Sequence, residues 1–522
     1  MDYYYVTLLI IIISALTWFI YALANRNCNY WKNRNVPYVS PVPFFGNLKS
    51  LLFLEKNVGE FLGDLYNSEK LPDHGFYGIY LTNNDPALII RDPELIRNIC
   101  IKDFQHFSNR NATSDEKNDP LGYNNLFTLT GSKWKFIRTK LTPTFTSGKM
   151  KQMFTLVKET SDELIRYLNE NSKEKNYTIM ETKRILAKFT VDVISTCAFG
   201  IKSNCLRDEK STFGFFSDMI FETTVKRAYE WRAFFFVHWM IKGLGGVFLR
   251  KESTEYFRKV FDETMKERES QKIFRNDFVD NLIKLKNEQE EKLKKEENGK
   301  KTFDKDEIFE LKGDLLLAQS VAFFTAGFET TSTTMTYSLY ELALNPEVQE
   351  KLREEILRSM EKHDGCLTYD GIMEMNYLSM VVSETLRKYP PLPFLDRICT
   401  MDYKIPGTDV VVKKGTPIYI PLFNGLHYDS KYYPEPEKYI PERFTEENKK
   451  TRHPYSYLPF GEGPRTCIGA RFGSMVSKIG LCAILSNFKV ETCSKTAVPL
   501  EQNHRSLLFC TKDGCFLKYT KL

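Results

Sequence analysis

The sequence predicts a mainly α-helical protein with small β-sheets, in which a membrane-spanning helix precedes one large body. Helical patterns dominate most of the chain, and the longest of them, Leu311–Leu344, would run roughly 50 Å as one helix. Strand patterns are few, short and set beside turns: Phe76–Tyr80, Ala87–Ile90, Val410–Val412 and Thr416–Ile420. The uncharged run Tyr3–Asn25 has the length of one bilayer crossing.

The N-terminal run divides the chain into three parts: an anchor at 1–25, a basic and proline-rich hinge at 26–46, and a body at 47–522. Asp2 precedes the run and Arg26, Lys32 and Arg34 follow it, so the positive-inside rule predicts a luminal N-terminus and a cytosolic body. Closely spaced prolines predict a stiff hinge. A cleaved signal peptide is the alternative, and the length of the run and the lack of positive charge before it disfavour that reading.

The composition excludes several classes of protein. A chain of 522 residues, 42% hydrophobic and 14% aromatic, can bury a large core around a cofactor, and a net charge of +6 is too small to indicate nucleic-acid binding. The 11 cysteines show no pairing rhythm, which argues for reduced thiols rather than a disulfide framework. The 7 histidines form no metal-binding motif, so metal chemistry would run through cysteine.

The loop at 460–469 holds Cys467 just ahead of the helical pattern Ala470–Leu485. A helix N-terminus favours thiolate over thiol, and Arg465 adds a nearby positive charge. Such a thiolate would be a strongly donating ligand for haem iron and would favour O–O cleavage. For any single cysteine, a buried thiol packed as a small hydrophobe is the alternative.

Two further patterns carry polar groups into apolar surroundings. In the long helix, Glu329 stands beside Thr330, and an acid next to an alcohol is typical of proton delivery, although a helix kink with a satisfied polar side chain is equally compatible. Glu384 and Arg387 share one helix face at a spacing that is also common in surface ion pairs, and Arg443 supplies a second arginine.

These motifs together resemble the cytochrome P450 family of haem-thiolate monooxygenases. The loop fits the haem-binding signature Phe-x-x-Gly-x-Arg-x-Cys-x-Gly, and Ala326–Thr331 looks like the oxygen-activation motif. Four further segments resemble the insect microsomal branch linked to detoxification: Tyr30–Lys32, Phe44–Asn47, Thr142–Lys149 and Pro390–Arg397. The resemblance implies a cytochrome P450 fold with an N-terminal transmembrane helix, in the endoplasmic reticulum membrane.

The resemblance also implies a role for each site residue. Cys467 would bind the iron of haem b, Thr330 and Glu329 would deliver protons, and Glu384, Arg387 and Arg443 would form a structural network under the haem. Phe460 would shield the sulfur, and the haem propionates would be held by Trp134, Arg138, Arg397 and Arg465. The substrate pocket would be shaped by Phe127, Phe323, Phe324, Ala326, Phe394 and Leu507.

The implied reaction inserts one oxygen atom from O2 into a lipophilic small molecule, either a xenobiotic or an endogenous one. No flavin or dinucleotide fingerprint is present, so electrons are expected from NADPH through a separate cytochrome P450 reductase, with cytochrome b5 as a second candidate partner. A basic cluster would suit an acidic redox partner: Lys133, Lys135, Lys140, Lys449, Lys450 and Arg452. The rivals are a haem-thiolate isomerase or dehydratase and a non-catalytic haem-binding membrane protein.

Two further segments lie outside these motifs. The aromatic-rich stretch Phe213–Trp239 is compatible with ordinary core or with a surface that dips into the bilayer. The charged run Lys284–Asp306 predicts a solvated, mobile loop.

Overall fold

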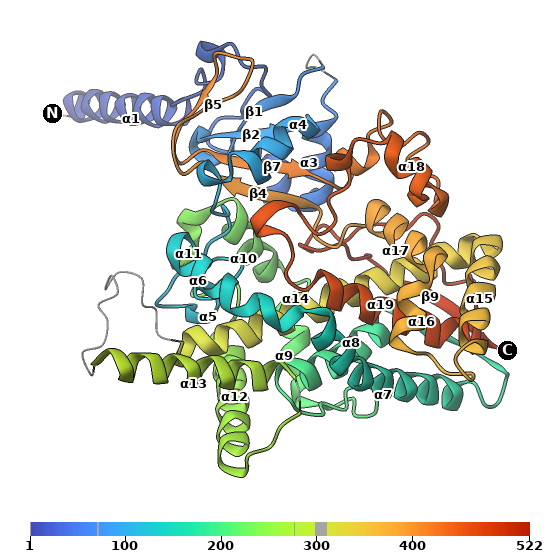
Figure 1. The fold of residues 1–522 in the computed structure, drawn as a ribbon. Helices are drawn as coiled ribbons and strands as arrows, with labels where there is room; N and C mark the ends of the chain where they lie inside the picture. Colours follow the sequence, from blue (N-terminus) through green and yellow to red (C-terminus); the bar gives the residue numbers. More distant parts are fainter. Residues whose placement is uncertain (1, 70–72, 276, 298–310) are drawn as a thin grey trace.

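The computed structural model describes residues 2–69, 73–275, 277–297 and 311–522, and it confirms a mainly helical body with small sheets (Figure 1). A long central helix, α14 (Gly313–Leu344), runs through this body and packs against α8 (Thr182–Ala198), α17 (Asn376–Lys388) and α19 (Ala470–Leu485). Most of its side chains are buried on all sides, which explains why its sequence shows a nearly continuous apolar and hydroxyl pattern rather than one apolar stripe.

The sheets are small, as expected, and the sequence pattern predicted only some of their strands. The largest sheet has the order β1-β2-β7-β4, formed by β1 (Phe76–Tyr80), β2 (Pro86–Ile90), β7 (Pro417–Pro421) and β4 (Phe394–Ile398). Strand β4 pairs antiparallel with β7, with Arg397 opposite Ile418. The second sheet joins β3 (Tyr177–Glu181), β9 (Phe516–Lys521) and β8 (Phe488–Glu491), and the third joins β5 (Tyr403–Lys404) to β6 (Val411–Val412).

The remaining α-helices surround this framework. They are α2 (Lys49–Leu52), α3 (Val58–Tyr66), α4 (Pro93–Arg97), α5 (Pro120–Tyr123), α6 (Gly131–Leu141), α7 (Ser147–Asn171), α9 (Thr212–Phe221), α10 (Val225–Phe235), α11 (Ile241–Leu244), α12 (Lys251–Gln271), α13 (Phe278–Glu297), α15 (Pro346–Glu361), α16 (Tyr369–Glu374) and α18 (Glu446–Thr451).

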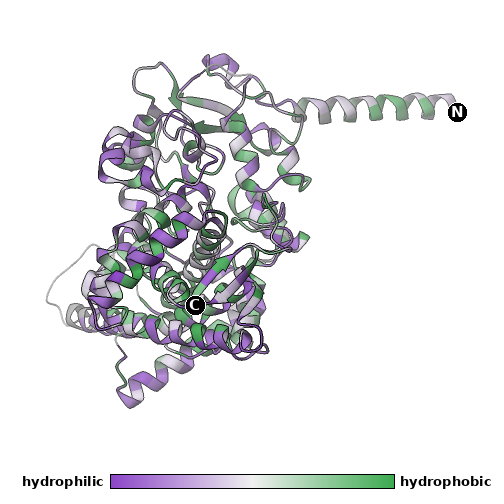
Figure 2. Ribbon diagram, turned by 90° about the vertical axis from the view of Figure 1, so that its right-hand side faces the viewer, coloured by the Kyte–Doolittle hydropathy of each residue, from purple (hydrophilic) through white to green (hydrophobic). Residues whose placement is uncertain are grey.

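The N-terminal helix α1 (Asp2–Ala24) projects away from the body (Figures 1 and 2). Its described side chains include many exposed apolar ones, among them Leu9, Ile10 and Trp18, the last 70% exposed. Over the residues that the structure describes, no helix combines the length and the apolar character needed to cross a bilayer.

The aromatic stretch Phe213–Trp239 is mostly core. Phe213, Trp231 and Phe234 are buried, and Trp231 stacks against Phe221 in the interior. Two rings remain outside, because Phe215 is 62% and Trp239 68% exposed. Most of the aromatic character therefore serves packing between α9, α10 and their neighbours.

The expectation of a loop at 284–306 was wrong for its first half. Residues up to Glu297 continue α13, which begins at Phe278 and buries Val279 and Leu282 against the body. Lysine and glutamate are good helix formers, so a highly charged composition does not prevent a helix that has a few apolar anchors. Residues 298–306 lie outside the described residues.

Candidate active site

A cavity of about 300 Å³ lies at the centre of the body, beneath the middle of α14. Its wall combines Ala326, Gly327 and Thr330 of α14 with Phe460 and Cys467 of the loop before α19. The two segments are far apart in sequence and meet here because α14 and α19 pack directly against each other. Most of the wall is apolar, so the polar groups that face the cavity stand out.

The cysteine loop has a shape that depends on glycine. Gly461 and Gly463 have φ values of 69° and 72°, a region that residues with a Cβ rarely adopt. At Gly463 a Cβ would also lie 2.0 Å from the carbonyl oxygen of Cys100. The turn closes with the Cys467 N–H donating to the Phe460 carbonyl at 2.8 Å, and it leaves Cys467 accessible from the cavity.

The sequence predicted that the surroundings of Cys467 favour thiolate over thiol, but the protein groups alone do not produce that preference. The thiol of Cys467 faces an internal cavity and is surrounded by protein, so desolvation raises its pKa, and the Gly469 N–H and the positive charges of Arg138 and Arg110 oppose that rise without cancelling it. Arg465 is not among the opposing charges, contrary to the expectation from its position in the sequence. A cationic metal centre would supply the charge that this site lacks for a thiolate.

Four arginines gather beside the cavity: Arg110, Arg138, Arg397 and Arg465. The carboxylate of Asp396 lies beside these arginines, with its Oδ1 3.0 Å from Arg110 Nη1. Burial and the neighbouring guanidinium groups of Arg110, Arg397 and Arg138 lower the pKa of Arg465 to about 8. Four arginines beside one carboxylate form an environment that favours an additional anion.

The hydrogen bonds of these four arginines also indicate a site for an anion. Arg465 donates to three backbone carbonyls, those of Ser108, Leu126 and Leu129, and its guanidinium lies 4.0 Å from the Trp134 ring centroid. Arg397 Nε is buried and has no partner among the described residues. Arg110 was missed by sequence reasoning, because nothing in its local sequence marks it and only the β4 neighbour Asp396 places it here.

Glu384, Arg387 and Arg443, the three residues of the predicted network, lie together in the structure. Glu384 and Arg387 are fully buried and joined by two hydrogen bonds of 2.7 and 2.9 Å, and Arg443 Nε lies 3.4 Å from Glu384 Oε1. Sequence reasoning missed His427, which connects this network to the cysteine loop. Its Nδ1–H donates to the Arg387 carbonyl and its Nε2 accepts from the Leu458 N–H, two residues before Phe460.

The acid and the alcohol of α14 separate in the structure. Thr330 lines the cavity and its hydroxyl donates back to the Ala326 carbonyl at 2.6 Å. Glu329 instead turns toward α8, where its Oε1 lies 2.9 Å from the ammonium of Lys183. Lys183 was not singled out from the sequence, because its partner lies 146 positions away.

The predicted substrate-contacting residues fall into two groups. Phe127, Phe323 and Ala326 line the cavity. Phe324 is buried against Phe199, Phe213 and Phe257, Phe394 packs on Phe235 and Phe236, and Leu507 is buried elsewhere, so these three do not form its wall. Other apolar residues take their place: Phe145, Phe278, Leu392, Leu395 and Phe472.

The chain belongs to the cytochrome P450 family, whose model matches residues 36–518. It is 48% identical to cytochrome P450 6k1 of Blattella germanica over 502 residues, covering 94% of this chain and 93% of that protein. It is 40% identical to cytochrome P450 6j1 of the same species, covering 96% and 95%, and 38% identical to the probable cytochrome P450 6g2 of Drosophila melanogaster, covering 98% of each.

Members of this family are haem-thiolate monooxygenases that take electrons from a redox partner, and the residues at the cavity fit haem. Cys467 is placed to be the iron ligand at one end. The arginine group, with Trp134 beside it, offers the cationic donors that two propionates require. Haem held in this way supplies the activation of O2 for oxygen insertion.

Proposed function

We propose that this protein is a membrane-bound monooxygenase that inserts one oxygen atom from O2 into lipophilic small molecules, using NADPH-derived electrons from a reductase of the endoplasmic reticulum. The proposal rests on one observation: Cys467, in the loop before α19, and Thr330, in α14, face the same cavity, whose wall is mainly apolar. Phe127, Phe323 and Ala326 would contact the substrate, and the apolar wall favours molecules without charge.

Each of four site residues would have a separate role in this reaction. The Cys467 sulfur would bind the haem iron, and Phe460, whose carbonyl accepts from the Cys467 N–H, would shield the sulfur. The Thr330 hydroxyl is held at the cavity by its bond to the Ala326 carbonyl and would relay protons into the cavity. Glu329 would supply those protons after its ion pair with Lys183 opens, because in the present arrangement its carboxylate points away from the cavity.

Two measurements test the proposal. The reduced, haem-loaded protein with carbon monoxide should give the absorption band of thiolate-ligated haem, and a band typical of nitrogen or thiol ligation would contradict the role of Cys467. With purified reductase and a lipophilic probe, the protein should consume NADPH and form a hydroxylated product. Product formation without O2 or NADPH would favour an isomerase or dehydratase, and binding without turnover would favour a non-catalytic haem protein.

The N-terminal helix is proposed as a single-pass anchor with the body on the cytosolic face. Its exposed apolar side chains and the exposed Phe44 and Trp239 would lie in or at the bilayer. The chain should float with liposomes, and a variant that begins at residue 26 should float much less while keeping its haem. Protease added outside sealed microsomes should digest the body; protection of the body would contradict this orientation.

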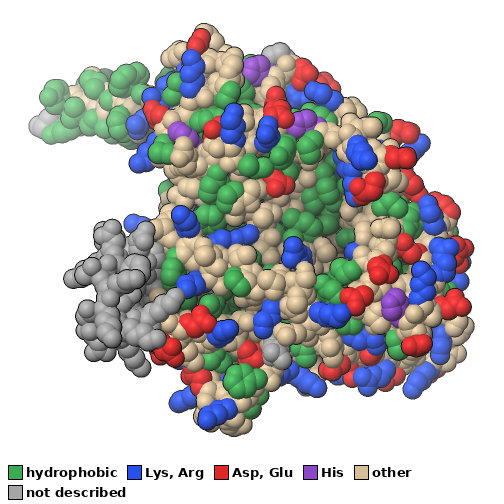
Figure 3. Space-filling model, in the orientation of Figure 1, with side chains coloured by type: hydrophobic (Ala, Val, Ile, Leu, Met, Phe, Trp, Pro, Cys, Tyr) green, Lys and Arg blue, Asp and Glu red, His purple; other side chains and the backbone are tan. Residues whose placement is uncertain are grey.

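The redox partners are proposed to dock on exposed basic residues of α6 and of α18. Lys135 of α6 is exposed, as are Lys449 and Lys450 of α18, and Figure 3 shows basic and acidic side chains interspersed around a hollow with an apolar floor. Lys135→Glu should raise the reductase concentration needed for half-maximal turnover about fivefold at low salt and less at high salt. The same change at exposed Lys266 of α12 should have no effect; cytochrome b5 should compete with reductase for this surface.

A further inference from the structure

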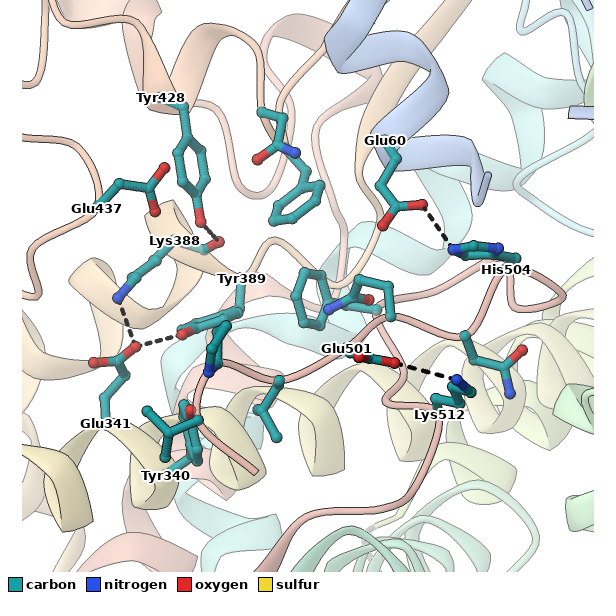
Figure 4. Close-up of a pocket in the computed structure, with 18 of the residues that line it drawn as sticks. Glu60, Tyr340, Glu341, Lys388, Tyr389, Tyr428, Glu437, Glu501, His504 and Lys512 are labelled. Carbon is teal, nitrogen blue, oxygen red and sulfur yellow. Dashed lines mark hydrogen bonds and ion pairs between the residues drawn. The ribbon is translucent and has the colours of Figure 1, made fainter. Parts of the chain in front are cut away.

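A second and larger cavity, of about 1160 Å³, lies apart from the haem cavity and shares no lining residue with it. Glu60 of α3, the end of α14 from Tyr340 to Leu344, Lys388 at the end of α17 and the turn Val498–Lys512 form its wall (Figure 4). A thin partition separates the two spaces: Tyr389 lines the larger cavity, whereas Pro391 and Leu392 line the haem cavity.

One side of this larger cavity is a continuous aromatic wall. Phe509 contacts Tyr389 edge to face with ring centroids 5.1 Å apart, Phe423 contacts Phe509 at 4.8 Å, and Tyr428 contacts Phe423 at 5.4 Å. Phe509 also donates its N–H to the Pro391 carbonyl at 3.3 Å, which fixes the wall to the partition. Ring faces attract cations and not anions.

Among the described residues, some charged side chains around the aromatic wall form ion pairs, and one carboxylate does not. Lys388 Nζ lies 2.8 Å from Glu341 Oε1, an oxygen that the Tyr389 hydroxyl also reaches, so the charge of Lys388 is already balanced (Figure 4). Glu501 pairs with Lys512 at 3.2 Å. Glu437 stands beside Tyr428 (Figure 4) and forms no ion pair with any residue that the structure describes.

A carboxylate at one end of an aromatic wall is the arrangement that holds an organic ammonium group. Exposed Arg505 is the unmatched cation among the lining residues, but an anion drawn to it would find ring faces that disfavour negative charge. The volume exceeds what a drug-sized molecule needs, so the apolar body of such a cation has room against Phe423 and Phe509.

We propose that this cavity is a binding site, separate from the haem cavity, for an organic cation with an apolar body, whose ammonium group lies between Glu437 and Tyr428. Binding at this site requires no haem chemistry, so this proposal can be tested independently of the proposed monooxygenase function.

The probe for this site is benzyltrimethylammonium, measured by calorimetry on the haem-loaded protein with the haem cavity filled by a saturating azole ligand of the iron. We expect saturable binding to one site, with phenylacetate and neutral benzyl alcohol binding at least tenfold more weakly. Loss of probe binding once the azole is present, or equal binding of phenylacetate, would overturn the proposal.

Two variants locate the site. Glu437→Gln should weaken the probe about fivefold, as expected for an exposed carboxylate that contacts a cation. Phe423→Leu, which keeps an apolar side chain and removes the ring face, should weaken it by a similar factor. Glu435→Gln is the matched control, because Glu435 lies two positions away, pairs with Lys438 and does not line the cavity. Unchanged binding in both variants would overturn the proposal, and the carbon monoxide spectrum separately verifies that each variant is folded and loaded.

Discussion

The ammonium of Lys183 lies 2.9 Å from Glu329 Oε1 and holds this carboxylate against α8, while the neighbouring Thr330 faces the haem cavity. The same ammonium donates to Ser332 Oγ at 2.6 Å and to Thr333 Oγ1 at 2.9 Å, so it ties one full turn of α14 to α8. The acid and the alcohol that stand side by side in sequence thus belong to different environments, and their contributions can be separated by experiment.

Removing Lys183 should destabilise the protein. In Lys183→Met, Glu329 would lose its cationic partner in a site where its side chain is only 11% exposed, and we expect a loss of about 2 kcal/mol. The measurement is the denaturant midpoint for loss of thiolate-ligated haem. Lys188→Met is the control, since Lys188 on the same helix pairs with a 75% exposed Glu209. The double variant Lys183→Met/Glu329→Gln should regain most of the loss; if it does not, the ion pair is not the cause.

Thr330→Ala should uncouple turnover from NADPH consumption. Without the hydroxyl, proton delivery at the cavity slows, and more of the reduced oxygen leaves as peroxide. Peroxide formed per NADPH should rise severalfold, and Thr330→Ser should restore coupling. Thr336→Ala serves as the control, because the Thr336 hydroxyl makes the same kind of bond to the Ser332 carbonyl but is buried away from the cavity. Unchanged coupling in Thr330→Ala would remove Thr330 from the mechanism.

Arg387→Ala should abolish haem incorporation. It leaves Glu384 buried without its partner, and breaking such a pair costs about 3–5 kcal/mol in a region that supports the cysteine loop. Haem content is measured by the pyridine haemochrome absorbance per protein. Arg353→Ala removes a pair of the same i,i+3 spacing from the surface, where Glu350 is 57% exposed, and should have little effect. Normal haem content in Arg387→Ala would show that the network is dispensable.

His427 should make the protein sensitive to mild acid. Burial, with the charges of Arg387 and Arg452, lowers the pKa of His427 from its ordinary value of about 6.5 to about 3. Because the unfolded chain binds the proton more readily, the stability is complete above pH 6.5 and falls by about 1 kcal/mol per pH unit below it. The denaturant midpoint at pH 7.5 and 5.5 reports this loss.

His427→Gln is the informative variant for that measurement. A glutamine side chain can donate to the Arg387 carbonyl and accept from the Leu458 N–H, yet it does not titrate. We expect the pH dependence between 7.5 and 5.5 to become shallower by about one proton. The same slope in the variant and the natural protein would assign the acid sensitivity to other groups.

Gly463→Ala should disturb the iron ligand while Gly469→Ala should not. The Cβ at Gly463 would clash with the Cys100 carbonyl in a left-handed backbone conformation, whereas a Cβ at Gly469 meets nothing within 4 Å and its φ is −90°. The carbon monoxide spectrum of Gly463→Ala should therefore shift away from that of thiolate-ligated haem. Equal spectra for the two variants would show that the loop tolerates the displacement.

Several features followed from the sequence because they depend on neighbours along the chain. The bounds of α19 and β1 match the predicted segments, and the long helix begins only two residues later than expected, since periodicity and turn residues set these elements. Cys467, Thr330, Glu384 and Arg387 could be singled out as candidates from the sequence because each belongs to a short motif. Strand β4 was missed because Pro393 and a polar centre at Asp396 hide a strand that is buried on both faces.

The sequence alone therefore determined the family and the mainly helical class, because the family motifs and the helical periodicity each lie within short stretches of the chain. Only the tertiary structure decided which groups meet across the body. Lys183 pairs with Glu329, Arg110 pairs with Asp396, and His427 accepts a hydrogen bond from the Leu458 N–H. The tertiary structure also places Phe324 and Phe394 outside the cavity wall. The physical reason is that long-range ion pairs and the orientation of an aromatic ring are set by how helices pack, and local sequence carries little information about that packing.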